Sequence, residues 1–342
     1  MSTLPDETPA RDPESAVDTD VVVVGGGAAG LSAATFLARY GLDTTVFARG
    51  HSAIRQCAHL ENYLGFPGGI SPERFLALGR RQATHEGASV VDDLVEWVER
   101  VGEVYDDETT ADEEDETGTA TDGSAAADDA TETGDSTERL CPARFRVQTQ
   151  DDRTLHARYV LVASAYDGDY LEPLVDDLDR EAEHGFVEAE AGRTPVEGLY
   201  AAGWLTRETV HQAIVNAGDG ARAAVALARD DLRDRYWDAL ADIYVDWVVD
   251  DDRYGGEEWA ADFDDWFDRE MAPGAPDDVD DGELAEVREA AKESFLDRCV
   301  DESERAERER RGQELLLEEL DDDVIREYVA GLDDEARAEE VI

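Results

Sequence analysis

The chain has 342 residues, of which 86 are Asp or Glu and 31 are Lys or Arg, so its formal net charge is −55. This charge repels phosphate backbones and anionic lipid surfaces, which excludes nucleic acid and membranes as expected partners. No apolar run reaches the roughly 18 residues that a spanning helix needs, and the polar N-terminus lacks the apolar core of a signal peptide, so we expect a cytoplasmic protein. Cys57, Cys141 and Cys299 show no C-x-x-C or metal-type spacing, so neither a disulfide framework nor a metal site is expected.

The stretch VVVVGGGAAGLSAATFLARYG, at 21–41, changes from a run of β-branched residues to apolar residues at helical spacing. Between them lies a G-x-G-x-x-G loop. Its first glycine permits a tight turn, its second lets a pyrophosphate approach the backbone, and its third lets helix and strand pack closely. The helix start presents unpaired N–H groups to the phosphates. The predicted binding positions of this loop are Gly25, Gly27, Ala28, Ala29 and Gly30.

The segment LDTTVFARG, at 42–50, predicts the second strand of the same unit. A dinucleotide site ordinarily has an Asp or Glu at the end of this strand, about 20 residues after the glycines, to bind the ribose hydroxyls. This chain has Ala48 there, followed by Arg49. We therefore expect Arg49 beside the cofactor and no carboxylate at the ribose.

Residues 104–138 form a low-complexity acidic tract with almost no large apolar residue, which predicts a disordered insertion. The flanking segments, 87–101 and 143–165, have the alternating pattern of strands, and 143–165 is expected to hold two strands around a turn and then a buried strand. The insertion therefore interrupts a small β-meander at a hairpin.

Residues 193–229 predict a short buried strand, a polar loop and an Ala-rich helix broken around Gly218 and Gly220. From about residue 230 acidic and apolar residues alternate at helical spacing, which predicts an acidic helical region. The expected parts are a disordered tail at 1–18, an α/β domain at 19–229 that contains the insertion, and an α-helical region at 230–342.

Three stretches, in this order and at this spacing, resemble the flavin-binding domain of low-molecular-weight thioredoxin reductases. They are the glycine loop, ENYLGFPGGI at 61–70, and TPVEGLYAAG with HQAIVNAGDGARAA within 194–224. The resemblance implies a Rossmann-type FAD-binding domain with a central parallel sheet, whose glycine loop holds the ADP half of FAD. A cofactor as long as FAD also needs a second helix N-terminus near the flavin. The flavin-side residues that the resemblance implies are Asn62, Gly203, Gln212 and Ala213.

The chain departs from this family at several positions. Trp204 stands where the family has an Asp that holds the ribitol chain. Only 32 residues separate Ala165 from Gly198, and a single βαβ unit takes about 30 or more. We therefore expect the family's NAD(P)H domain, with its redox C-x-x-C, to be absent.

Arginine carries almost all of the positive charge, because Lys292 is the only lysine. This bias is similar to that of proteins from extremely halophilic archaea. Molar salt there shortens the Debye length to about 3 Å and screens the repulsion between acidic residues. A halophilic protein of the haloarchaeal type is therefore expected.

Three side chains near the expected flavin are candidates for catalysis. Cys57 and His59 lie in IRQCAHLEN, which would place a reactive thiol near a base, although a lone Cys is more often a small buried hydrophobe. His211, beside Gln212, is a candidate for stabilising negative charge on reduced flavin, although a solvent-facing histidine is the commoner outcome.

Two functions are compatible with these patterns. The first is a FAD-dependent oxidoreductase that receives electrons from a redox partner protein or a small donor, with a homodimer as a further possibility. The second is a non-catalytic sensor or assembly protein that keeps the same fold, with or without flavin. A yellow colour on purification would discriminate between them.

The helical region begins with a stripe of apolar side chains, which favours packing over ligand binding. We expect Trp237, Tyr244 and Trp247 to pack on the flavin domain, with 255–271 continuing a cover over the flavin. The competing hypothesis is an independent acidic arm that recruits the electron-donor protein.

Overall fold

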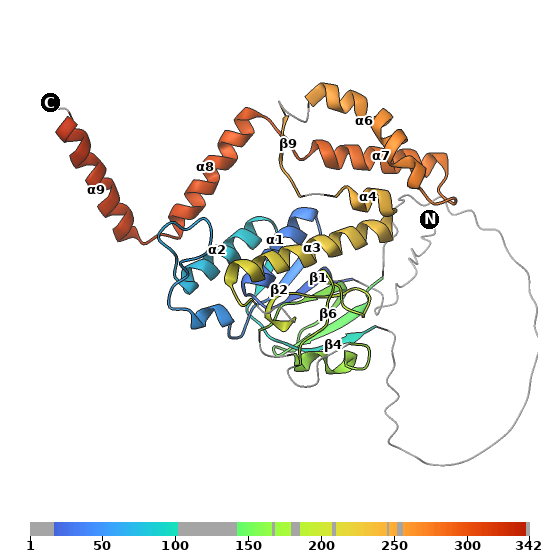
Figure 1. Cartoon of the computed structure of the whole chain (residues 1–342), viewed down its shortest axis with the longest axis horizontal. Helices are drawn as coiled ribbons and strands as arrows, with labels where there is room; N and C mark the ends of the chain where they lie inside the picture. The colour runs from blue at the N-terminus through green and yellow to red at the C-terminus, as the bar shows by residue number, and fades with distance from the viewer. Residues whose placement is uncertain are drawn as a thin grey trace, which may run out of the picture.

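The computed structural model describes residues 17–101, 142–165, 168–178, 185–206, 210–244, 246–251 and 256–339. The predicted insertion, Cys141, and all but the last two residues of the predicted tail lie outside these ranges. Within them, none of the helices is long and apolar enough to cross a membrane. The chain has an α/β domain and a helical C-terminal region, which rises from one side of it in Figure 1.

Seven strands form one mixed sheet, in the order β3-β2-β1-β6-β5-β4 with β7 also paired to β6. Pairing is parallel among β3, β2, β1, β6 and β7 and antiparallel from β4 through β5 to β6. The strands are β1 Thr19–Val24, β2 Thr44–Phe47, β3 Ser89–Val91, β4 Val95–Arg100, β5 Phe145–Thr149, β6 Thr154–Val162 and β7 Leu199–Ala201. The predicted central parallel sheet and small β-meander are confirmed.

β6 joins the two parts of the sheet. The sequence predicts two strands after the turn that follows β5, but the structure has one nine-residue strand. Its first half pairs with β5, as in Phe145↔Ala157, and its second half pairs with β7, as in Val160↔Leu199. A single strand of this length therefore carries the meander at one end and the returning strand at the other.

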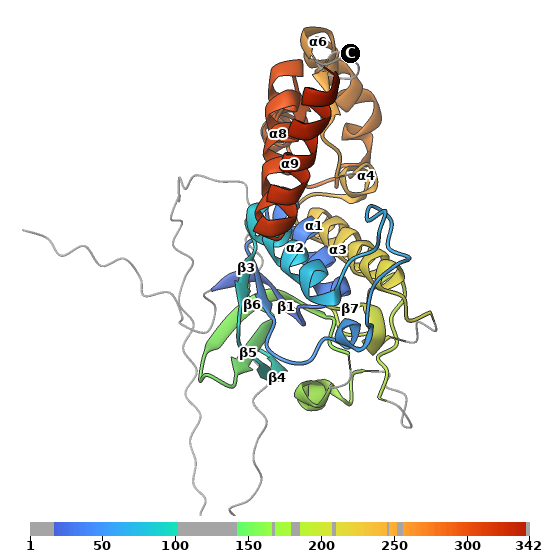
Figure 2. The ribbon, with the colours of Figure 1, turned by 90° about the vertical axis from the view of Figure 1, so that its left-hand side faces the viewer.

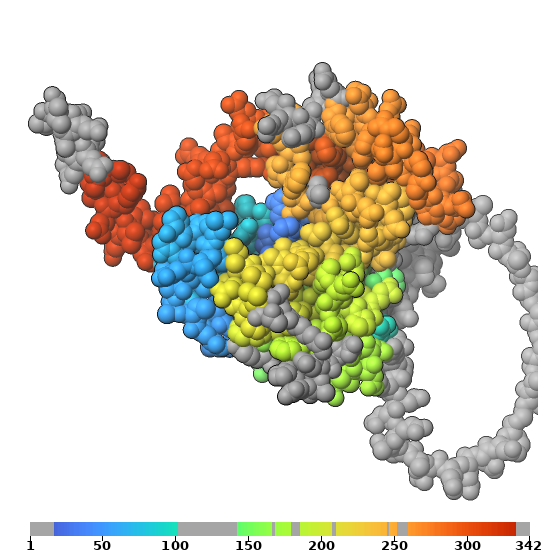
Figure 3. Space-filling model, viewed as in Figure 1, coloured from blue at the N-terminus to red at the C-terminus, as the bar shows by residue number. Residues whose placement is uncertain are grey.

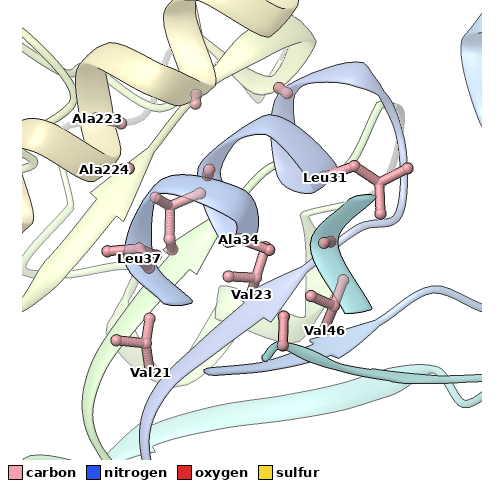
Figure 4. Close-up of a cluster of buried hydrophobic side chains, with 14 of the residues drawn as sticks. Val21, Val23, Leu31, Ala34, Leu37, Val46, Ala223 and Ala224 are labelled. Atoms are coloured by element: carbon pink, nitrogen blue, oxygen red, sulfur yellow. The ribbon is translucent and has the colours of Figure 1, made fainter. Parts of the chain in front are cut away.

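β1 is buried on both faces, as its run of valines predicts. Val21 and Val23 belong to a hydrophobic cluster with α1, α2 and α3, whereas Val22 and Val24 belong to a second cluster on the opposite face. Figure 4 shows the helix-side cluster, where Val21 and Val23 lie beneath Leu37 and Ala34 of α1. Side chains alternate between the faces of a strand, so only a fully apolar run satisfies both clusters.

Three α-helices cover one face of the sheet, and a 3₁₀ helix lies on the other (Figures 1 and 2). The α-helices are α1 Ala28–Tyr40, α2 Pro72–His85 and α3 Ala213–Arg235, and the 3₁₀ helix is η3 Asp169–Leu174. Shorter 3₁₀ helices are η2 Ala53–Gln56 and η4 Gly203–Leu205. Among the described residues between β6 and β7, η3 is the only helix.

α3 is continuous from Ala213 to Arg235, so the expected break around Gly218 and Gly220 is wrong. Gly220 lies where α3 crosses α1, and a Cβ on it would come within 2.0 Å of the Ala29 carbonyl oxygen. The glycine therefore permits close packing of two helices, which sequence alone does not distinguish from a helix break. α3 also continues across the boundary predicted between residues 229 and 230, so the last turns of this helix belong to the predicted C-terminal region.

A buried ion network holds the second half of α3 against the sheet. The Asp231 side chain is fully buried and accepts a hydrogen bond from Arg158 at 3.1 Å and another from Arg235 at 2.6 Å. Tyr40 of α1 also donates to Asp231, at 2.9 Å. Burial, followed by the Asp231 charge, raises the pKa of Tyr40 far above its ordinary value, so it stays a neutral donor. Because α3 is one continuous helix, this network near its C-terminal end also fixes where its N-terminal end lies.

The C-terminal region has a core of its own. Its elements are α4 Asp238–Asp242, β8 Val249–Asp250, α6 Gly256–Glu270, η5 Ala272–Gly274, α7 Asp281–Leu296, β9 Cys299–Val300, α8 Glu302–Glu318 and α9 Asp322–Glu339. Trp237 is buried against Phe267 and donates its indole N–H to the Met271 carbonyl at 3.1 Å. Phe263 and Val287 complete the centre of this cluster.

This arrangement corrects the expected cover. Of its three aromatic residues, Tyr244 packs on the α/β domain, with its ring 4.9 Å from that of Tyr40. Trp237 faces the C-terminal core, and Trp247 is 68% exposed. Among the described residues, nothing from 230 onward lines the cleft at the glycine loop. The aromatic residues of 255–271 pack against one another and against α7, so they do not form the expected cover over the α/β domain.

α8 runs from the C-terminal region back towards α2, and α9 extends away from the body of the molecule, as Figures 1 and 3 show. Their junction lies beside α2, where Arg81 pairs with Glu318, and Arg74 pairs with Asp321 at 2.9 Å. These contacts are ionic and partly exposed, so they are sensitive to salt. Ion pairs therefore join the C-terminal region to α2.

Candidate cofactor site

A cleft of about 820 Å³ opens at the carboxyl ends of β1 and β6. Its size is near the upper end of ordinary small-molecule sites, about 300–1,000 Å³. The cleft is lined by the glycine loop, the segment from the end of β2 through 62, two side chains of α2, the residues after β6, and the start of α3. This is the place at which open α/β sheets bind ligands.

The glycine loop has the geometry that its spacing predicts. Gly25 has φ +117°, and a Cβ there would lie 2.6 Å from the Ala163 carbonyl oxygen. A Cβ on Gly30 would lie 1.8 Å from the Gly25 carbonyl oxygen, so this glycine packs helix on strand and does not line the cleft. A Cβ on Gly27 would meet only the Ser52 hydroxyl, at 3.2 Å. Gly27 alone of the three therefore keeps open space for a ligand.

Two helix N-termini meet in this cleft. α1 begins after Gly27 and α3 begins after Gln212, and neither helix has a side-chain cap or an acidic residue in its first turn. By contrast, the first turns of α2, α4, α7, α8 and α9 each contain an acidic residue. First-turn N–H groups lack intrahelical acceptors and carry partial positive charge. The two helices at the cleft therefore leave these N–H groups for a ligand.

The cleft is also depleted of acidic residues. About one residue in four of the chain is Asp or Glu, yet Glu61 is the only one among the described lining residues. The basic side chains that line it are Arg49, Arg55, Arg80, His51, His59 and His211. A cleft of this composition in a chain of charge −55 is suited to an anionic ligand.

Arg49 lines the cleft, but its guanidinium is held elsewhere. It donates to both carboxylate oxygens of Asp151, at 2.6 and 2.8 Å, and to the Asp92 carbonyl at 2.6 Å. The hydrogen bonds to Asp151 raise the pKa of Arg49 above its ordinary value. Asp151 belongs to the turn between β5 and β6, far from Arg49 in the chain, so this pairing was not predictable from the sequence.

The predicted flavin-side residues lie together, and two of them contact each other. Asn62 donates its side-chain amide to the Gln212 side-chain oxygen at 2.6 Å, and both line the cleft with Ala213. Trp204 stacks on His211, with ring centroids 4.4 Å apart at 19°. Trp204 therefore forms an aromatic wall beside the start of α3.

Gly203 does not line the cleft, although the resemblance implied a cofactor contact there. It has φ +72°, and its amide donates to the Asp219 carboxylate at 2.6 Å. Asp219 lies on the second turn of α3 and holds the start of η4, the 3₁₀ helix that contains Trp204. Its link to Gly203 depends on the packing of α3 on the sheet, so the sequence analysis did not find it.

Cys57 and His59 are exposed and line the cleft. His59 packs against Gly69, and its Nδ1 lies 3.8 Å from Glu61. Within the described residues the Cys57 thiol has no hydrogen-bond partner, so no base activates it in this geometry. The candidate catalytic roles of both remain predictions.

Asn216 is a lining residue that the sequence analysis missed. Its side-chain oxygen is buried and has no hydrogen-bond partner among the described residues. A buried polar atom without a partner costs about 1–3 kcal/mol, which a bound ligand would relieve. In the sequence Asn216 is one polar residue in an Ala-rich helix and matches no motif. Its possible role is visible only in the structure, where it lines the cleft.

Fold and cleft together define a Rossmann-type domain of the dinucleotide-binding class. Residues 19–130, a third of the chain, match the sequence family described as pyridine nucleotide-disulphide oxidoreductase. The thioredoxin reductase of Aquifex aeolicus (strain VF5) is 39% identical over 74 residues, which are 21% of this chain and 23% of that protein. The chain thus spans about a quarter of the length of this curated relative.

Solved thioredoxin reductases are also similar to this chain. The enzyme from Gloeobacter violaceus has a TM-score of 0.45 and 16% identity, over 64% of this chain and 96% of its own. The enzyme from T. acidophilum has a TM-score of 0.43 and 17% identity, over 63% of this chain and 99% of its own.

Proposed function

We propose that this protein is a FAD-binding oxidoreductase with a flavin domain like that of the thioredoxin reductases. The observation that carries the proposal is the pair of uncapped, acid-free helix N-termini that meet in one cleft. We infer a ligand that fills much of this cleft and brings an anionic group to one helix start and a polar acceptor to the other. FAD has this form, with its pyrophosphate and its flavin pyrimidine oxygens.

The residues present fit this cofactor. The amides of Ala28 and Ala29, above the open face of Gly27, would hold the pyrophosphate. Gln212, Ala213 and the unsatisfied oxygen of Asn216 would face the flavin end. When bound, the flavin supplies hydride or single-electron transfer. The protein's own contribution is binding and orientation of the cofactor by these groups.

The electron donor in this proposal is another protein or a small diffusible molecule. The support for this is the short connection from β6 to β7, where η3 is the only helix among the described residues. It packs Leu171 and Leu174 into the hydrophobic cluster on the face of the sheet opposite α1. The described residues of this connection contain no α-helix and no strand, which supports an external donor.

FAD should bind to the purified full-length protein, or already be present and give a yellow solution. Binding is measured from the visible spectrum and by calorimetric titration of any colourless fraction, in about 1 M KCl so that acidic repulsion is screened. Absence of flavin absorbance, together with no heat of binding and no thermal shift at excess FAD, would exclude the proposal.

NADPH and NADH should not reduce the bound flavin directly. We expect dithionite to bleach it under anaerobic conditions, while either nicotinamide at concentrations of a typical KM, about 1 μM to 1 mM, leaves the spectrum unchanged. Rapid bleaching by NADPH would show that the chain binds its own nicotinamide donor and would contradict the external-donor part of the proposal.

The alternative is a non-catalytic sensor or assembly protein on the same fold. The hydrogen bond between Asn62 and Gln212 favours it, because these side chains satisfy each other at the expected flavin end. Reduction and reoxidation of bound flavin without change in any partner protein, or a protein that binds no flavin, would favour this second candidate.

A further inference from the structure

We propose that Arg80 binds a phosphate group of the adenine dinucleotide at the end of β2, where such a site ordinarily has a carboxylate. This inference rests on the proposed function, because it assigns a residue to the same cleft. It goes beyond that function because it names the group that is bound at the adenosine end of the cleft. There the sequence has Ala48 in place of the usual carboxylate.

The position of Arg80 is fixed by packing of α2 on α1. Gly79 lies against Leu31, with 3.1 Å between the Leu31 Cδ1 atom and the position of a Cβ on the glycine. The next residue, Arg80, therefore reaches over the end of β2. Its Nη2 donates to the Ala48 carbonyl at 3.1 Å and lies 3.6 Å from the position of a Cβ on Gly26. The guanidinium thus lies between the glycine loop and β2.

Arg80 differs from the other two arginines of the cleft because each of those pairs with a carboxylate. Arg49 pairs with Asp151 at 2.6 Å and Arg55 with Glu73 at 3.9 Å. Arg80 has no carboxylate within ion-pair distance among the described residues, in a chain with 86 acidic residues. A guanidinium has five N–H donors, and one carbonyl uses only one of them. The remaining donors can bind a phosphate in a bidentate manner.

Two phosphates of an adenine nucleotide can lie at this end of the cleft. One is the 5′-diphosphate, which FAD and ADP share. The other is a phosphate on the ribose 2′ oxygen, which a carboxylate at the end of β2 would repel and an arginine would attract. Ala48 removes that repulsion, and Arg80 supplies attraction for either group. The shared chemistry is a phosphate ester of adenosine.

The test measures dissociation constants of the full-length protein for FAD, ADP and adenosine 2′,5′-bisphosphate by calorimetry. Arg80→Gln should weaken at least one of them by about tenfold or more, and Arg80→Lys should weaken it less. Loss confined to FAD and ADP identifies the diphosphate. Loss confined to the bisphosphate identifies the 2′-phosphate. Arg81→Gln is the matched control, because Arg81 does not line the cleft and pairs with Glu318.

Equal affinities of wild type and Arg80→Gln for all three ligands would overturn the assignment while FAD binding itself supports the proposed function. If the wild type binds no FAD but binds the bisphosphate through Arg80, the FAD proposal fails and the Arg80 assignment holds. If it binds none of the three, both fail. Melting curves without ligand show whether either variant is destabilised.

Discussion

We expect Gly27→Val to weaken FAD binding by on the order of 100-fold or more and to leave the fold intact. Gly27 has φ −89° and ψ −168°, an extended conformation that valine adopts readily. A Cβ at this position meets only the Ser52 hydroxyl, at 3.2 Å, and Gly27 lines the cleft, so we expect the valine methyl groups to enter the space of the ligand. There they displace a phosphate from the first-turn amides of α1. Losing two charge-assisted hydrogen bonds of about 1.5–3 kcal/mol each weakens binding by on the order of 100-fold or more.

The matched control for this variant is Gly218→Val. Gly218 is exposed on α3, has open space where a Cβ would lie, and does not line the cleft. This variant should bind FAD as the wild type does. Affinity is measured by calorimetry and folding by far-UV circular dichroism. A Gly27→Val protein that is folded and binds FAD with wild-type affinity would remove the glycine loop from the proposed site.

The folded state should lose stability steeply as salt falls from about 1 M to about 0.1 M, because the Debye length grows from about 3 to about 10 Å. At the longer range, repulsion reaches between neighbouring acidic side chains across the surface. The formal charge of −55 makes this the largest global effect that we expect. Thermal melting at a series of KCl concentrations measures it, with sucrose as a control for solute exclusion.

The ion pairs of the structure respond to salt in different ways. Arg326 pairs with Asp322 and Asp323 on the exposed surface of α9, and such pairs contribute little at any salt. Arg158 of β6 and Asp231 of α3 form a buried pair, which is screened much less. Net repulsion among unpaired acids therefore dominates the response. A melting temperature that does not change with KCl over this range would contradict the expected halophilic character.

Much of the α/β domain was predictable, because its signals are local. The valine run of β1, the glycine loop and the apolar spacing of α1 each report on neighbouring residues of one element. The meander was predictable from alternation on both sides of the acidic tract, despite the length of that tract. Strand order followed in general form, since a parallel unit with a short helical crossover leaves few topologies.

Part of the candidate site was also predictable, namely the positions fixed by backbone geometry. Gly25 and Gly27 lie where the motif requires, and Asn62, Gln212 and Ala213 reach the same cleft. The contacts of each side chain in the cleft depend on tertiary packing and were not predictable from the sequence. Arg49 was expected to face the cofactor, but Asp151 neutralises it from a turn that is about a hundred residues away in the chain.

The sequence by itself determined the nucleotide-binding loop, the sheet that carries it and the acidic character of the whole chain, because these depend on residue type and near-neighbour spacing. Only the tertiary structure decided that α3 is unbroken at Gly220, that Trp237 packs into a separate core, and that Arg80 lies over the end of β2. Each of these depends on which helix faces cross and how closely. The physical reason is that packing joins segments far apart in the chain. The periodicity of one segment shows which of its faces is buried, but not which other segment packs on that face.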